Sequence, residues 1–313
     1  MATYTVLTSQ TIKDLLQNYD LGELLDFQIM DGGQANSSSI IVTEQGKYVL
    51  SVCDEKSEEE IQLLTSILEH LNHHGFRTSR LIKTCEGAGN IEYQGKPVYI
   101  KEFIAGQVEK ALSAEMYYQI GQELAKLHNV AVPPAFPKRF SYGIEKFIEV
   151  TATDGDYPEW LLEKAKQLQS CINDDLPRGL VHGDLFYDNI LFHEGKLTAV
   201  LDFEEACHYF LLFDLGMCIA GSCSVEEKLS MDSTASLIEG YESVRQLEKL
   251  EKELLQLHII YGAVATSFWR YRQFNIVHPD IGKNHVYSEM MNLANYVDSI
   301  SETYFYEKIF AIT

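Results

Sequence analysis

The most constraining feature of this sequence is a stretch in which three polar residues follow short apolar runs at fixed spacing. Asp184 follows the run Leu180-Val181 and a His-Gly pair, and Asn189 comes five residues later beside a second apolar run. Asp202 closes a third, mostly apolar run and precedes a phenylalanine. Two strands around a polar loop would bring the three side chains together at one end of a hairpin. The stretch therefore predicts a chemical site.

These residue types are the ones that transfer of a phosphoryl group from ATP to a hydroxyl requires. One carboxylate, Asp184, would accept or orient the proton of the hydroxyl, while the amide of Asn189 and the carboxylate of Asp202 would hold Mg²⁺ on the phosphates. Taken singly, the three would be interpreted as a turn residue, a strand-edge residue and a helix cap. The combined spacing HxDxxxxN, apolar run and DF is much more specific. His182 is interpreted as a brace of the loop, not as a base.

The distance to the next aspartate excludes a protein kinase. Only eleven residues separate Asp202 from Asp214. A protein kinase needs a longer activation segment after its metal-binding aspartate, ending in an APE-type motif, and this sequence has none. The phosphoryl acceptor is therefore expected to be a small molecule.

The net charge and the cysteines limit which binding partners and which cellular location are expected. A net charge of −21 at pH 7 repels phosphate backbones and anionic lipid, so we expect neither nucleic acid nor a membrane as a partner. The six cysteines show no CxxC pairing, which is typical of reduced thiols in a cytoplasmic protein. The N-terminus lacks a signal-peptide pattern, and no apolar run reaches the roughly 18–20 residues of a membrane helix. The sequence leaves a homodimer open.

Hydrophobic periodicity predicts an α+β fold. Helical spacing occurs at 9–19 and 56–73, and strand-like segments flank a turn at Gln45-Gly46 and recur at 90–95 and 97–106. Beyond these segments helical patterns dominate, and they are clearest in three ranges, 116–129, 160–171 and 247–273. We expect a small β-rich N-lobe, 1–104, that binds the nucleotide, and a larger, mostly helical C-lobe, 105–313, with the catalytic loop and the acceptor pocket.

The segments HGDLFYDN, LDFEEAC and LFDLGMC resemble the aminoglycoside phosphotransferase and choline kinase superfamily. Within it the chain resembles most the bacterial homoserine kinases of this fold, in which segments similar to GGQANSS, GKYVLSVCDEK and IGQELAKLH follow in the same order. The resemblance implies a two-lobed, protein-kinase-like fold with MgATP as the phosphoryl donor. It implies that Asp184 is the base, that Asn189 and Asp202 are the metal ligands, and that Asp214 supports the catalytic loop.

The resemblance also implies a phosphate site in the N-lobe. Gly32, Gly33 and Asn36 lie where a turn over the phosphates is expected, although an ordinary hairpin turn explains the same pattern. The lysine that usually touches the α- and β-phosphates of ATP falls at Ser51. Lys56 or Lys101 would then supply the positive charge.

Three further residues complete the predicted nucleotide site. Glu60 matches the usual partner of the missing lysine, with a first-turn helical acid as the alternative interpretation. Glu102 and Ile104, at the hinge between the lobes, would meet the adenine through backbone groups.

Four residues are candidates for binding the acceptor: Tyr187, Glu204, Glu205 and Arg270. The acidic pair would meet an ammonium group, although bacterial homoserine kinases tend to have aromatic residues there and a solvated acidic pair is the alternative. Arg270 falls where those enzymes carry an arginine and would pair with a carboxylate, unless it forms ion pairs within the chain. Tyr187 would line the acceptor pocket or simply pack.

These patterns predict an ATP-dependent kinase of a small, hydroxylated, amine-bearing acceptor, with homoserine first. Choline, ethanolamine, other hydroxy-amino acids, aminoglycosides and natural-product intermediates are the alternatives, because one fold serves many acceptors. The serine at position 51 leaves a second class open, a nucleotide-binding pseudokinase without turnover. The unrelated homoserine kinase fold is excluded, since no PxxxGLGSSA-like run occurs.

Overall fold

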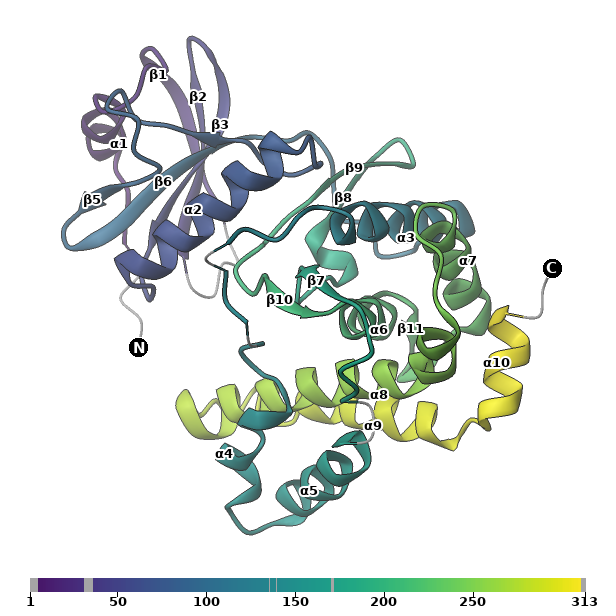
Figure 1. The fold of residues 1–313 in the computed structure, drawn as a ribbon. Coiled ribbons are helices and arrows are strands. Elements are labelled where there is room, and N and C mark those ends of the chain that lie inside the picture. The colour runs from purple at the N-terminus through teal and green to yellow at the C-terminus, as the bar shows by residue number, and fades with distance from the viewer. Residues whose placement is uncertain (1–4, 31–35, 135, 139, 170–171, 311–313) are drawn as a thin grey trace. The chain divides into compact units, whose positions relative to one another are not determined.

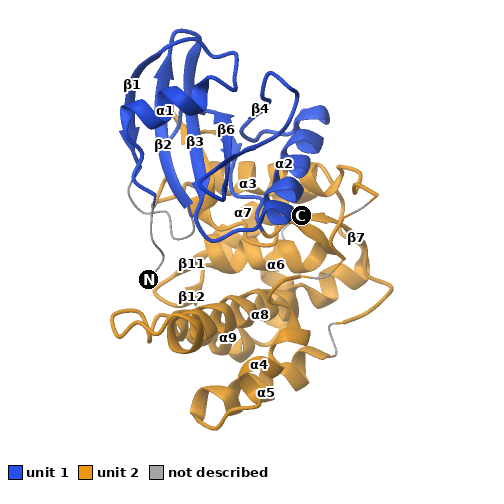
Figure 2. Ribbon diagram, turned by 90° about the vertical axis from the view of Figure 1, so that its left-hand side faces the viewer, with its two compact units in different colours: residues 1–106, 198–204 blue, residues 107–197, 205–313 orange. Residues whose placement is uncertain are grey.

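The structure is a computed structural model that describes residues 5–30, 36–134, 136–138, 140–169 and 172–310. The chain divides into two compact units, which Figure 2 shows in different colours. Unit 1 comprises Met1–Gly106 and Thr198–Glu204, and unit 2 comprises Gln107–Leu197 and Glu205–Thr313. The short segment Thr198–Glu204 therefore belongs to unit 1, although it is remote from the rest of that unit in the sequence.

Unit 1 is built on a six-stranded antiparallel sheet in the order β1-β2-β3-β6-β4, with β5 also paired to β6 (Figure 1). The strands are β1 (Leu24–Ile29), β2 (Asn36–Thr43), β3 (Gly46–Cys53), β4 (Leu81–Ile82), β5 (Ile91–Tyr93) and β6 (Lys96–Glu102). The predicted hairpin is confirmed, because Thr43 pairs with Gly46 across its turn. The sequence patterns did not predict β1, an edge strand with mostly exposed side chains and therefore no clean apolar alternation.

The two faces of this sheet differ in character. Leu50 and Val52 of β3 and Val98 and Ile100 of β6 pack in one apolar cluster with helix α1 (Ser9–Leu16). Alternation along a strand places the intervening side chains of β3 and β6 on the opposite face. Unit 1 also contains helix α2 (Glu58–His73), which begins at a capping box formed by its N-cap serine and the glutamate at position 60.

Unit 2 is mostly helical. Its helices are α3 (Ala114–His128), α4 (Ile148–Thr151), α5 (Asp156–Leu168), α6 (Leu211–Ser222), α7 (Met231–Glu242), α8 (Lys249–Tyr271), α9 (Tyr287–Ser299) and α10 (Glu302–Phe310), with the single turns η1 (Ile144–Lys146) and η3 (Tyr187–Asn189) and the π-helix η4 (Arg272–Val277). The predicted helices at 116–129 and 247–273 are confirmed as α3 and α8, and the helix predicted at 160–171 is confirmed as α5 as far as Leu168. Residues 170–171 of that prediction lie outside the described residues. Among the described helices none combines the length and the apolar character needed to cross a bilayer.

Short strands lie in the segments that connect these helices. They are β7 (Arg178–Val181), β8 (Ile190–His193), β9 (Lys196–Val200), β10 (Cys207–Phe210), β11 (Ser224–Val225) and β12 (Lys228–Leu229), and they form the pairs β7 with β10, β8 with β9, and β11 with β12. The two strands around a polar loop predicted between residues 179 and 203 are present, but their pairing as one hairpin is wrong. The strand before the loop, β7, pairs with β10, and the hairpin is formed by β8 and β9, which both follow the loop. β9 runs from unit 2 into the segment that belongs to unit 1.

Two glycines allow α3 and α7 to lie side by side, as Figure 1 shows. A Cβ atom at Gly121 would collide with the backbone carbonyl of Leu237, and one at Gly240 would collide with the carbonyl of Tyr118. Each glycine thus lets the backbone of the other helix approach. This close packing fixes the C-terminal end of α3, which carries His128.

The buried carboxylate of Asp214, on α6, holds the loop after β7. The backbone N–H groups of His182 and Gly183 each donate to it at 2.8 Å, and the Nε2 of His128 lies 3.1 Å from it. The other ring nitrogen of His128 bonds the hydroxyl of Tyr241 at 2.6 Å. Burial raises the pKa of Asp214, but the hydrogen bond and charge of His128 and the contribution of His182 outweigh it, so the pKa lies below its usual range.

Replacing this carboxylate should destabilise unit 2. Asp214→Asn has one acceptor oxygen where the wild type has two, so at least one buried donor loses its partner, and we expect the free energy of unfolding to fall by about 1–3 kcal/mol. Urea denaturation measures the change. Asp174→Asn is the matched control, because Asp174 is 95% exposed and its ion pair with Arg178 contributes less than about 1 kcal/mol. Equal losses in the two variants would contradict this role of Asp214.

His258, inside α8, should make stability depend on pH. Its Nδ1 donates to the carbonyl of Leu254 at 2.9 Å, and its buried Nε2 has no hydrogen-bond partner in the described part of the chain. Burial lowers the pKa of His258 from 6.5 to about 4, although the bond to Leu254 opposes the shift. As the pH falls from 6.5 towards 4, the unfolded chain therefore gains a proton that the folded chain excludes.

We expect this histidine's contribution to be complete above about pH 6.5 and to fall by about 3 kcal/mol on going to pH 4. His258→Leu, which has a similar volume and no titrating group, should flatten the curve of unfolding free energy against pH in this window. His285→Leu, at an exposed position, should keep the wild-type slope. The role of His258 would be refuted by two curves of the same slope for wild type and His258→Leu.

Candidate functional site

The loop after β7 carries Asp184 and Asn189, both in unit 2. Gly183 has a φ of +82°, and a Cβ there would lie 2.7 Å from the backbone carbonyl of Glu205, so the tight turn requires glycine. The N–H of Asp184 donates to Nδ1 of His182 at 3.2 Å. The side-chain nitrogen of Asn189 donates to the carbonyl of Asp184 at 2.8 Å. Local hydrogen bonds therefore hold both predicted site residues in one loop.

Asp202 lies in unit 1, after β9. Its φ of +61° is uncommon for a residue other than glycine and is often found at functional positions. The next residue, Phe203, is buried and packs edge-on against Phe76, with ring centroids 5.9 Å apart. The N–H of Val200 donates to the carbonyl of Arg77 at 2.9 Å. These contacts attach the Asp202 segment to the residues that follow α2.

The side chains of Asn189 and Asp202 fit Mg²⁺ chemically. Carboxylate and amide oxygens are the ligands that this hard cation prefers. The nitrogen of the Asn189 amide is used inside the loop, which leaves its oxygen as the ligand atom. Because Asp202 belongs to unit 1 and Asn189 to unit 2, the convergence of these side chains with Asp184 stays a prediction.

A cluster of charges in unit 1 brings together residues predicted for different tasks. Lys56 forms an ion pair with Glu204 at 2.9 Å, and the amide of Asn36 donates to the same carboxylate at 3.1 Å. Glu204, predicted to meet the acceptor, is therefore neutralised by a lysine of its own unit. Burial lowers the pKa of Lys101, and the negative charges of Asp202 and Glu204 partly oppose that shift.

Other residues of the predicted nucleotide site have structural partners. Ser51 is buried and its hydroxyl bonds that of Ser38 at 2.9 Å. Glu60 accepts the N–H of Ser57 in the capping box of α2, and this bond holds the pKa of Glu60 below its usual range. Glu60 thus acts as the first-turn acid that was its alternative interpretation, whatever else it does.

For the remaining residues of the predicted nucleotide site, the described part of the chain shows no side-chain contact that bears on nucleotide binding. The backbone N–H of Glu102 donates to the carbonyl of Arg80 at 2.8 Å, and Ile104 follows β6 without regular secondary structure. Gly32 and Gly33 lie outside the described residues.

The residues of unit 2 that were predicted to bind the acceptor differ in whether their side chains already have partners in the protein. The buried Oε2 of Glu205 has no hydrogen-bond partner among the described residues, and the backbone of Glu205 adjoins Gly183. Arg270, in contrast, bonds Glu289 at 2.6 Å and the carbonyl of Val286 at 3.3 Å. Tyr187 is half-buried at the start of η3. In this group, Glu205 has the unused charged atom.

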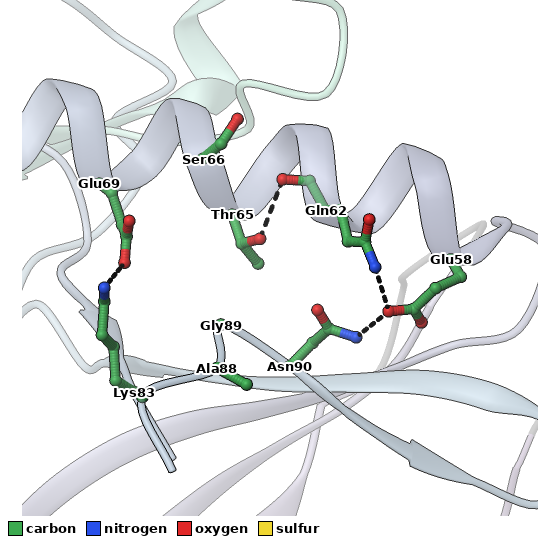
Figure 3. Close-up of a pocket in the computed structure, with 10 residues that line it drawn as sticks. Glu58, Gln62, Thr65, Ser66, Glu69, Lys83, Ala88, Gly89 and Asn90 are labelled. Atoms are coloured by element: carbon green, nitrogen blue, oxygen red, sulfur yellow. Dashed lines mark hydrogen bonds and ion pairs between the residues drawn. The ribbon is translucent and has the colours of Figure 1, made fainter. Parts of the chain in front are cut away.

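A cavity of about 280 Å³ lies in unit 1 between α2 and the segment around residues 83–90 (Figure 3). Glu58 accepts hydrogen bonds from Gln62 and Asn90 at one end, and Glu69 pairs with Lys83 at the other. Its polar groups thus bond one another. In the described part of unit 1 its lining includes none of the predicted site residues.

His128 is the functional candidate that the sequence patterns missed. It lies four residues after Leu124, on the apolar face of α3, so the helical period places it in the core. A buried polar side chain needs a hydrogen-bond partner there. That unusual burial is the one signal for it, and the partner, Asp214, is too remote in the sequence to be identified without the fold.

Comparison with known proteins identifies the family. The sequence profile described as the phosphotransferase enzyme family matches residues 26–250. A homoserine kinase from Gluconobacter oxydans is 30% identical over 82% of this chain and 84% of that enzyme. A homoserine kinase from Neisseria meningitidis is 26% identical over 90% and 94% of the two chains.

Solved structures show the same fold. Amicoumacin kinase in complex with AMP-PNP and Ca²⁺ has a TM-score of 0.73 and 14% identity over 94% of this chain and 96% of its own. The fold is therefore the two-lobed, kinase-like α+β fold, and the resemblance to the superfamily and to homoserine kinases is confirmed. The chain belongs to the phosphotransferase enzyme family and is a kinase that uses ATP to phosphorylate a hydroxyl group.

Proposed function

We propose that the protein phosphorylates the side-chain hydroxyl of homoserine with MgATP. The observation that carries the proposal is the similarity to enzymes named homoserine kinases, which are 26–30% identical over 82–90% of this chain. Similarity over so much of both chains extends well beyond the motifs of the predicted catalytic loop.

In this proposal Asp184 is the catalytic base. Its carboxylate accepts the proton of the acceptor hydroxyl as the new O–P bond forms and the bond between the γ-phosphorus and the bridging oxygen breaks, with ADP leaving. The hydrogen bonds from His182 and Gly183 to Asp214 hold the backbone next to Asp184. A fixed base contributes by positioning, since little covalent chemistry is left to the protein in such a transfer.

The metal ligands in this proposal are the amide oxygen of Asn189 and the carboxylate of Asp202. Mg²⁺, when bound, neutralises the charge of the β- and γ-phosphates. The hydrogen bond from the Asn189 nitrogen to Asp184 supports this role, because it orients the amide and links the metal ligand to the loop of the base.

We assign the ammonium group of the acceptor to Glu205. Its Oε2 has no donor among the described residues, and a buried carboxylate oxygen in that state gains most from a cationic ligand. Glu204 is less suited, because Lys56 already neutralises it. A carboxylate on the acceptor would have to compete with Glu289 for Arg270.

A cytoplasmic location, the absence of nucleic-acid binding and a homodimer stay predictions.

A panel of acceptors tests the activity. With MgATP, purified protein should form phosphohomoserine faster than it phosphorylates choline, ethanolamine or an aminoglycoside, as mass spectrometry of the products would show. Asp184→Asn should lower kcat by about 10²–10⁴-fold, because the base is lost, with ATP affinity nearly unchanged. Asp174→Asn, on the surface of the same unit, should retain the wild-type rate.

Two results would overturn these assignments. ATP binding without transfer to any acceptor would favour the pseudokinase, and a kcat of Asp184→Asn within tenfold of wild type would remove Asp184 from the role of base.

The assignment of Glu205 predicts a loss that depends on the acceptor's charge. Glu205→Gln should lower kcat/KM for homoserine by roughly 10–100-fold, the size expected when a hydrogen bond between charged groups is weakened. It should change kcat/KM much less for 4-hydroxybutanoate, which lacks the amino group, and should leave the KM for ATP unchanged. Steady-state kinetics with both acceptors measures the difference. An equal loss with both acceptors would show that Glu205 does not read the ammonium group.

A further inference from the structure

β6 divides its side chains between the two faces of the unit 1 sheet. Val98 and Ile100 belong to the apolar cluster with α1, so alternation places Tyr99 and Lys101 on the opposite face. Ser51 of β3 shares that opposite face, because it is the register partner of Tyr99. The lysine therefore points away from the apolar core, on the same side as the buried serine.

Among the described residues, the ammonium group of Lys101 has no carboxylate or hydrogen-bonding partner. It is partly buried, and it makes no hydrogen bond or ion pair with any described residue; its Nζ lies 5.8 Å from the centroid of the Tyr99 ring. Lys56 and Lys96, by contrast, each bond a carboxylate, at 2.9 and 2.6 Å. A partly buried charge without a partner costs free energy, and an anionic ligand recovers that cost.

The charged groups around Lys101 indicate which kind of anionic ligand it would bind. The carboxylates of Asp202 and Glu204 act on it electrostatically, together with the thiol of Cys53. Glu204 is already paired with Lys56, whereas Asp202 forms no ion pair with a described residue and accepts only the backbone N–H of Glu204, at 3.4 Å. An ammonium on the same sheet face as Ser51, within electrostatic range of a carboxylate suited to Mg²⁺, supplies the two kinds of group that a metal-bound polyphosphate requires.

We propose that Lys101 binds the phosphate chain of ATP and supplies the positive charge that Ser51 cannot. Ser51 is buried and bonded to Ser38, so it offers neither a charge nor a free hydroxyl. Lys101 reaches the same face of the sheet from the neighbouring strand. This inference rests on the proposed function through the assignment of Asp202 to Mg²⁺, and the experiment separates the two.

Binding measurements on three variants test the role of Lys101. Lys101→Met keeps the length of the side chain and removes its charge, Lys101→Arg keeps the charge, and Lys13→Met removes an exposed lysine of α1 as a control. Isothermal calorimetry with MgATP and with adenosine then separates phosphate binding from adenine binding. We expect Lys101→Met to bind MgATP at least about tenfold more weakly and adenosine as well as the wild type does. Lys101→Arg should stay within a few fold for both ligands.

Folding and activity controls keep the result interpretable. Lys101→Met should keep the wild-type urea midpoint, since it replaces an unpaired, partly buried charge; Lys101→Gln takes its place if it does not. An unchanged ratio of MgATP to adenosine affinity in the charge-removing variant would overturn the role of Lys101. If the wild type phosphorylates homoserine in that case, the proposed function stands alone. If the ratio falls but no acceptor is phosphorylated, Lys101 stands and the proposed function fails.

Discussion

The buried carboxylate of Asp214 is the interaction on which the arrangement of unit 2 depends. An ionised group among apolar helices is favourable only when its surroundings satisfy it, and here two backbone N–H groups and His128 do so. The same bonds fix His182 and Gly183, and with them the backbone that carries Asp184. One buried charge therefore couples helix packing to the position of Asp184, the predicted base.

Ion pairing sorts the charged residues near the candidate site into two classes. Lys56 and the amide of Asn36 both bond the carboxylate of Glu204, so the charges of Lys56 and Glu204 serve the structure of unit 1. Lys101 and Glu205 have charged atoms without hydrogen-bond partners in the described residues. The first class costs little to bury, whereas the second gains from a ligand of opposite charge. The ligands proposed for them, a polyphosphate for the lysine and an ammonium group for the glutamate, are of that kind.

Much of the fold was predictable because local patterns agree with tertiary packing. α2 combines a capping box, first-turn acids and an apolar stripe, and the strands of the β2–β3 hairpin flank a polar turn. β1 was missed because an exposed edge strand buries too few side chains to show alternation. α5 begins at Asp156, earlier than its apolar period indicates, because its first turn contains two acids and a proline that interrupt that period.

The sequence alone determined the chemistry: an aspartate, an asparagine and a second aspartate at a spacing that few functions other than phosphoryl transfer explain. Only the tertiary structure decided which neighbouring charges are available, because ion pairs join residues that are remote in the sequence. Glu204 and Glu205 are adjacent and chemically identical, yet Lys56 neutralises the first and the second keeps an unpartnered oxygen. Spacing along a chain identifies groups, but folding determines which of them have partners.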